Sequence, residues 1–327
     1  MNQLLIHMRI KEMKKVLKVL GIIVLVIIIV IAAVLFYLSR KGSSLSEDYQ
    51  SKVATGGDIE AKYLKNGVYE TSYYEIAAIQ NFSKYEIYYP KELLTSDKEY
   101  PVIVVCNGTG WPGSRSKPLY EHYASWGFIV IATEEEYSWN AFGADMCVGL
   151  LKKLNDTESI ELDGFEDKKN VFYGHIDFNN IGIVGHSQGG VGVVNAITNS
   201  DHQDIYRTAA ALSPTGKELA LGIDWPYDAT KINVPILLIS GAGGGDDWVV
   251  TGEGLADIYN DISANKVMAR RKDTDHGKTQ FSEDGYVTAW FMWQLQGDAE
   301  AAKAFTGDDP ELLNKPLYQD QRIDLGE

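Results

Sequence analysis

The chain is poor in cysteine, with only Cys106 and Cys147 among its 327 residues. Two cysteines at this spacing cannot build a disulfide framework, and they lack the paired spacing of a structural zinc site. Cys106 ends an apolar run and Cys147 lies in a helix-like one, so the favoured interpretation is two buried thiols. A single disulfide between them is the alternative.

Basic residues are also scarce relative to acidic ones. Lys and Arg number 30 against 45 Asp and Glu, which gives a formal net charge of −15 at pH 7. An acidic chain repels polyanions, so the composition argues against nucleic acid as a partner.

Long apolar runs are limited to one, residues 19–38, which is about the length needed to cross a bilayer. The run follows a basic segment, so we predict a cytoplasmic tail over 1–18 and a membrane-spanning helix over 19–38. A polar tether over 39–58 and a globular domain over 59–327 then lie outside the cell membrane. The alternative is a secreted protein released by signal cleavage, although 36–41 is not a small-residue cleavage site.

Apolar strand-like runs alternate with helix-like segments after residue 100, a pattern typical of a mostly parallel sheet with helices on both faces. Tyr-rich alternation over 60–89, interrupted by Asn66-Gly67, predicts an antiparallel hairpin at the edge of that sheet. Strands are predicted over 101–106, 128–132, 181–185, 208–212, 235–240 and 266–270, and helices over 116–126, 141–154, 253–262 and 283–295.

The most informative stretch is Gly185-His186-Ser187-Gln188-Gly189, which stands between an apolar strand and an apolar helix. This is the Gly-x-Ser-x-Gly pattern of a nucleophile elbow, in which flanking glycines leave room for a strained turn and the serine hydroxyl is exposed. Ser187 is therefore the candidate nucleophile.

A serine nucleophile needs a base and an acid, and in proteins with such an elbow both follow the serine in chain order. His202 and His276 are the only histidines after Ser187, and His276 follows a strand-like run. His276 is therefore the candidate base. Asp247 is the predicted acid because apolar residues directly after it would anchor it, and its neighbour Asp246 remains the alternative.

An oxyanion hole needs preorganised backbone donors. We expect the amide of Gln188 and an amide from the loop after Cys106, with Thr109 as the chosen residue. Trp111 and Trp248 are predicted walls of the substrate site. This chemistry requires no metal and no organic cofactor.

The elbow, Cys106-Asn107-Gly108-Thr109-Gly110 and Asp275-His276-Gly277 together resemble the α/β-hydrolases, nearest to the dienelactone hydrolase and polyester-hydrolase (cutinase-like) branch. The resemblance covers about 60–300. It implies an α/β-hydrolase fold and a serine esterase that cleaves small-molecule or polymeric esters through an acyl-enzyme. The cysteine nucleophile of dienelactone hydrolases is absent, and Thr215 stands where similar polyester hydrolases carry Trp.

Two functional alternatives stay open at this point. The same triad could serve an acyltransferase or a peptidase, and the fold could host a catalytically silent binding domain. The distance from Pro214 to Pro235 is too short for a helical lid domain, so we expect an open cleft without a large lid.

Overall fold

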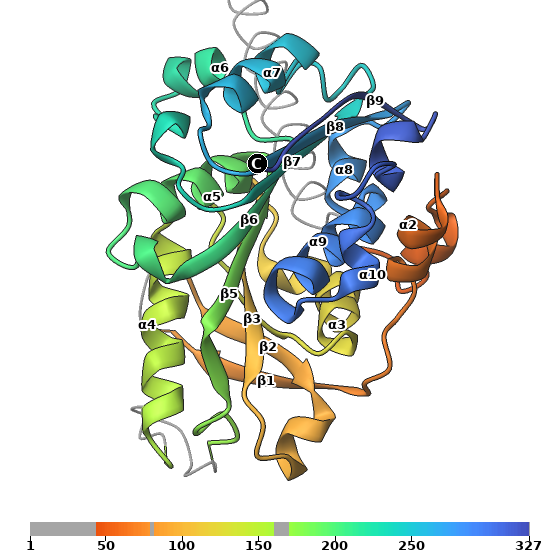
Figure 1. Ribbon diagram of the computed structural model, residues 1–327. Helices are drawn as coiled ribbons and strands as arrows, with labels where there is room; N and C mark the ends of the chain where they lie inside the picture. Colours follow the sequence, from red (N-terminus) through yellow and green to blue (C-terminus); the bar gives the residue numbers. More distant parts are fainter. Residues whose placement is uncertain (1–43, 79–81, 160–169, 327) are drawn as a thin grey trace, which may run out of the picture. The chain divides into compact units, whose positions relative to one another are not determined.

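A nine-stranded sheet runs through the part of the protein that the computed structural model describes, residues 44–78, 82–159 and 170–326. The strand order is β1-β2-β4-β3-β5-β6-β7-β8-β9, which places β5 in the middle (Figure 1). The strands are β1 (Thr71–Ala77), β2 (Lys84–Pro90), β3 (Tyr100–Cys106), β4 (Ile129–Thr133), β5 (Ile176–His186), β6 (Tyr206–Leu212), β7 (Ile236–Ala242), β8 (Lys266–Lys272) and β9 (Tyr318–Asp324).

The six inner strands β4, β3, β5, β6, β7 and β8 are parallel, whereas the outer strands β1, β2 and β9 pair antiparallel. Inner strands bury side chains on both faces: Val102, Ile103 and Val104 of β3 are all fully buried. Such strands are mostly apolar because neither face meets water, although β8 also buries Arg270 and Arg271. The predicted mostly parallel α/β sheet is confirmed.

Helices cover both faces of the sheet and form two separate apolar cores (Figure 1). The helices α4, α5 and α7 contribute to one core, and α2, α3, α9 and α10 contribute to the other. The α-helices are α2 (Asp58–Tyr63), α3 (Lys117–Ser125), α4 (Phe142–Asp156), α5 (Gln188–Asn199), α6 (Lys217–Gly222), α7 (Gly252–Asp261), α8 (His276–Ser282), α9 (Asp284–Gln296) and α10 (Ala299–Ala302). Short 3-10 turns are η1 (Tyr49–Lys52), η2 (Lys91–Thr95), η3 (Gly113–Ser116), η4 (Gln203–Ile205), η5 (Ala229–Lys231) and η6 (Glu311–Asn314).

The edges of the sheet differ from the sequence prediction. The hairpin of β1 and β2 pairs Thr71 with Pro90, so Asn66-Gly67 is not its turn. Gly67 instead packs against α3, where its amide donates to Ser125 Oγ at 2.8 Å. Strand β9 was not predicted, because it alternates between partly buried and exposed positions and carries mostly polar residues.

The predicted tether is also wrong from residue 44 onward. Tyr49 is only 2% exposed, and its hydroxyl donates to Asp284 Oδ2 on α9 at 2.6 Å. Further along the same segment, the Ala54 carbonyl accepts from the Arg271 guanidinium of β8. Contacts with α9 and β8 therefore make residues 44–58 part of the folded domain rather than a spacer.

The predicted basic tail and membrane-spanning segment, 1–18 and 19–38, lie outside the described residues. Across 44–78, 82–159 and 170–326, no helix has both the length and the apolar character needed to cross a membrane. The segment between Pro214 and Pro235, where a lid would be inserted, holds only the six-residue α6 and the three-residue η5.

Candidate active site

Ser187 occupies the turn between the end of β5 and the start of α5. Its backbone has φ 61° and ψ −121°, a conformation that non-glycine residues rarely adopt. A Cβ on Gly185 would lie 2.2 Å from the carbonyl oxygen of Gly189, and one on Gly189 would lie 2.1 Å from that of Cys106. Only glycine fits at both positions, so the Gly-x-Ser-x-Gly spacing follows from the packing of strand against helix.

His276 stands directly in front of the nucleophile. Its Nε2 lies 2.8 Å from Ser187 Oγ, although the two residues are 89 positions apart in the chain. His276 is the first residue of α8, so it is held by a helix rather than by a loop alone. The structure therefore brings together the two residues that the sequence predicted as nucleophile and base.

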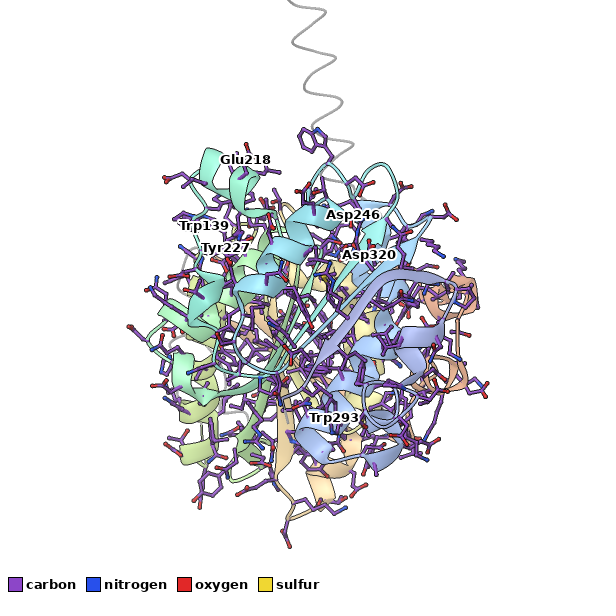
Figure 2. The ribbon with its side chains drawn as sticks, turned by 45° about the horizontal axis from the view of Figure 1, so that its top comes forward. Trp139, Glu218, Tyr227, Asp246, Trp293 and Asp320 are labelled. Atoms are coloured by element: carbon purple, nitrogen blue, oxygen red, sulfur yellow. The ribbon has the colours of Figure 1, made fainter. Side chains whose placement is uncertain are left out.

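The carboxylate that faces the imidazole belongs to Asp246. Its Oδ1 lies 2.6 Å from His276 Nδ1, and the side chain is fully buried at the carboxyl edge of the sheet (Figure 2). Asp247, which we predicted for this place, instead forms an ion pair with Arg270. The turn explains the difference, because the amides of Val249 and Val250 both donate to the Asp246 carbonyl and consecutive side chains diverge.

Ser213 is a site residue that sequence reasoning missed. Its hydroxyl donates to Asp246 Oδ2 at 3.0 Å, which leaves Oδ1 for the histidine. Ser213 directly follows β6, the strand next to β7, and its amide donates to Ile239 of β7. A polar residue at the carboxyl end of an inner strand was the available signal.

His186, beside the nucleophile, supports the base. Its Nε2 donates to the carbonyl oxygen of His276 at 2.9 Å, and the two rings lie 4.5 Å apart. Burial, with the nearby His276 adding to it, lowers the pKa of His186 to about 3. His186 therefore stays neutral and acts as a fixed donor.

The loop after β3 adjoins the nucleophile. Gly108 packs against the elbow, since a Cβ built on it would lie 3.9 Å from Ser187 Cβ. The amides of Gly110 and Trp111 donate to Glu136 and Gly108 carbonyls, whereas Thr109 is exposed.

Gln188, on the other side of the nucleophile, is held by its side chain. The side-chain Oε1 accepts from the amide of Ser138 at 2.7 Å. The backbone amide belongs to the first residue of α5, where no intrahelical carbonyl is available to it.

The two predicted aromatic walls line different cavities. Trp111 donates from Nε1 to Ser116 Oγ at 2.8 Å and lines a cavity of about 30 Å³ that His186 also lines. Trp248 is 81% exposed and lines an open groove of about 540 Å³ together with Lys217 and other residues of α6 and α7. Trp248 is therefore the more exposed of the two rings.

Both cysteines are buried and unbonded, which confirms the two-thiol interpretation. Burial raises the pKa of each thiol above its usual range. Cys106 lies directly beneath the elbow, where it packs against Gly185 and Gly189.

A mostly parallel sheet with a serine on the turn after its central strand, faced by a histidine that follows a later strand, defines an α/β-hydrolase. Comparison with known families agrees with this class. A family model described as PETase, PET hydrolase-like, matches residues 49–315. The chain belongs to the PET hydrolase-like family, and membership implies an ester hydrolase of the α/β-hydrolase type. No curated protein matches the chain.

Proposed function

We propose that the protein is a serine esterase that cleaves carboxylic esters with Ser187, His276 and Asp246. The observation that carries the proposal is an unbroken hydrogen-bond path from Asp246 through His276 to Ser187, with distances of 2.6 and 2.8 Å. Three side chains from three distant segments meet in the order that acyl transfer requires. Family membership supports the ester as the substrate class.

In the proposed reaction, His276 Nε2 accepts the Ser187 proton as the oxygen attacks the ester carbonyl carbon. Asp246 holds the imidazole in the tautomer with Nδ1 protonated and stabilises the imidazolium. His276 then protonates the leaving alcohol, and a water activated by the same base hydrolyses the acyl-enzyme. We assign the oxyanion hole to the backbone amides of Gln188, the first residue of α5, and of Thr109, in the loop after β3.

An ester on a small molecule or on a polymer is the proposed substrate. The exposed ring of Trp248, two residues after Asp246, supports contact with large substrates. An acyltransferase or peptidase would use the same three residues, and no contact of the site favours either. The complete set of triad contacts speaks against a catalytically silent binding domain.

A fluorophosphonate probe tests the proposal directly. The probe should acylate Ser187 alone, because among the residues that the structure describes only this hydroxyl bonds to a histidine ring. Ser187→Ala should abolish labelling and lower turnover of p-nitrophenyl butyrate by on the order of 10⁶, as for triad nucleophiles generally. Continued labelling of the Ser187→Ala protein would overturn the proposal.

We further propose that the apolar segment 19–38 anchors the enzyme in the cell membrane with the catalytic domain outside. The apolar length and the preceding basic residues support this placement. The protein should then sediment with membranes and resist washing with high salt, because apolar burial is insensitive to ionic strength. A soluble form that begins near residue 40 would instead indicate signal cleavage.

A further inference from the structure

Arg270 is a buried cation next to the proposed active site. It lies on β8 in register with Ser240 of β7, and its side chain is 6% exposed. The guanidinium forms ion pairs with Asp247 and with Asp320 of β9, the latter at 3.5 Å. Its Nε also donates to the Gly241 carbonyl at 3.2 Å. One side chain therefore connects three segments of the carboxyl edge of the sheet.

Two of these contacts lie on either side of Asp246 in the chain. We define the acid loop as residues 243–250, which connects β7 to the residues before α7. Gly241 lies near the end of β7, and Asp247 directly follows Asp246. Arg270 thus joins the end of β7 to the loop residue directly after the carboxylate that faces His276.

The loop needs an external support because of its composition. Gly243, Gly244 and Gly245 directly precede Asp246, and glycine has the largest conformational freedom of all residues. A planar guanidinium with several fixed donors can join a carbonyl and a carboxylate at once, which a lysine ammonium does less well. The contacts of Arg270 therefore restrict the backbone conformations that the glycines allow.

We propose that Arg270 is a positioning residue that fixes the acid loop so that Asp246 stays against His276. This inference rests on the proposed function. Asp247, on the same reasoning, is the residue through which Arg270 holds the loop, and it does not contact the imidazole. Asp320 completes the set of carboxylates around the buried cation.

The neighbouring Arg271 provides a matched control. Adjacent residues of a strand point to opposite faces of a sheet. Arg271 is also buried and ion-paired, to Glu60 at 3.0 Å, but its partners lie on the N-terminal segment and on β9. Replacing either arginine by methionine removes a buried charge of the same kind, and only Arg270 contacts the acid loop.

The experiment compares Arg270→Met, Arg270→Lys and Arg271→Met as full-length proteins with p-nitrophenyl butyrate. Arg270→Met should lower kcat about tenfold with KM within about twofold, because displacement of a triad member affects the chemical step more than binding. Arg270→Lys should fall between this variant and the wild type. Arg271→Met should lower the melting temperature but keep kcat within about twofold of the wild type.

A milder variant keeps the test valid if Arg270→Met does not fold. Asp247 is about half exposed, so Asp247→Asn should fold and should lower kcat about threefold at unchanged KM. The inference would be overturned if Arg270→Lys and Asp247→Asn both kept the wild-type kcat. It would also be overturned if Arg271→Met lowered kcat as much as Arg270→Met.

Failure of the proposed function would look different from failure of the inference. If the wild type neither turns over the ester nor reacts with the fluorophosphonate probe at Ser187, the proposed function is wrong. If the wild type reacts but the Arg270 and Arg271 variants have the same kcat, only the positioning role is wrong.

Discussion

The nucleophile elbow, residues 185–190, and the acid loop, residues 243–250, are turns after β5 and β7 on the same edge of the sheet but are held in different ways. The elbow is fixed by close backbone packing, since Gly185 packs on Gly189 and Gly189 packs on the Cys106 carbonyl at the end of β3. The acid loop contains a run of glycines, and side chains from other segments, Ser213 and Arg270, bond to its two aspartates. A short pattern can therefore specify the elbow, whereas no local pattern specifies which carboxylate of the acid loop faces the base.

The largest expected effect separates the two aspartates of the acid loop. Asp246→Asn should lower kcat by about 10⁴, because an amide cannot hold His276 in the required tautomer or stabilise its charged form. Asp247→Asn should cost far less, since its carboxylate bonds to Arg270. Steady-state kinetics on a soluble ester measure both. The reverse order would give the triad role to Asp247 and break the comparison.

The next effect tests the claim that close backbone packing fixes the elbow. Gly189→Ala should destabilise the protein by about 4 kcal/mol or more, because the new Cβ meets the rigid Cys106 carbonyl at 2.1 Å. Urea unfolding followed by tryptophan fluorescence measures the change.

Gly149→Ala is the matched control for that substitution. Gly149 lies within α4, and a Cβ there meets no atom within 4 Å. Removing a helical glycine should stabilise the protein by about 0.5–1 kcal/mol. Equal effects of the two substitutions would contradict the steric account of the elbow.

A further prediction concerns a second buried carboxyl near the acid loop. Glu283 is fully buried, and neither of its carboxyl oxygens has a hydrogen-bond partner among the residues that the structure describes. Burial raises the pKa of Glu283 well above its usual range, Arg271 opposes this shift, and the nearby Asp246 adds to it. Glu283 is therefore neutral at acidic pH in the folded protein.

The pKa of Glu283 is higher in the folded protein than in the unfolded chain. Its contribution to stability is therefore fully present at a pH below the pKa of the unfolded chain. This contribution is lost as pH rises toward the folded pKa, by up to about 1.4 kcal/mol per pH unit. Glu283→Gln keeps a neutral side chain of similar shape, so its stability relative to the wild type should increase from pH 5 to pH 8. Urea unfolding of both proteins across this range measures the difference, and parallel pH profiles would contradict it.

Much of the fold followed from the sequence alone. The inner strands are mostly apolar because helices cover both faces, so each of them was found from the sequence. The edges were not predictable in this way: β9 carries mostly polar residues, and Tyr49 looked like part of a polar spacer. Their places depend on pairing with β8 and on a buried hydrogen bond to Asp284, which are contacts with distant parts of the chain.

The sequence by itself determined Ser187 and His276, because the elbow is a local steric solution and chain order left few histidines. Only the tertiary structure decided that Asp246 faces the base. The physical reason is that two adjacent carboxylates have the same chemistry and nearly the same sequence position. Their directions are set by partners on β6 and β8: Ser213 follows β6 and bonds to Asp246, while Arg270 on β8 binds Asp247.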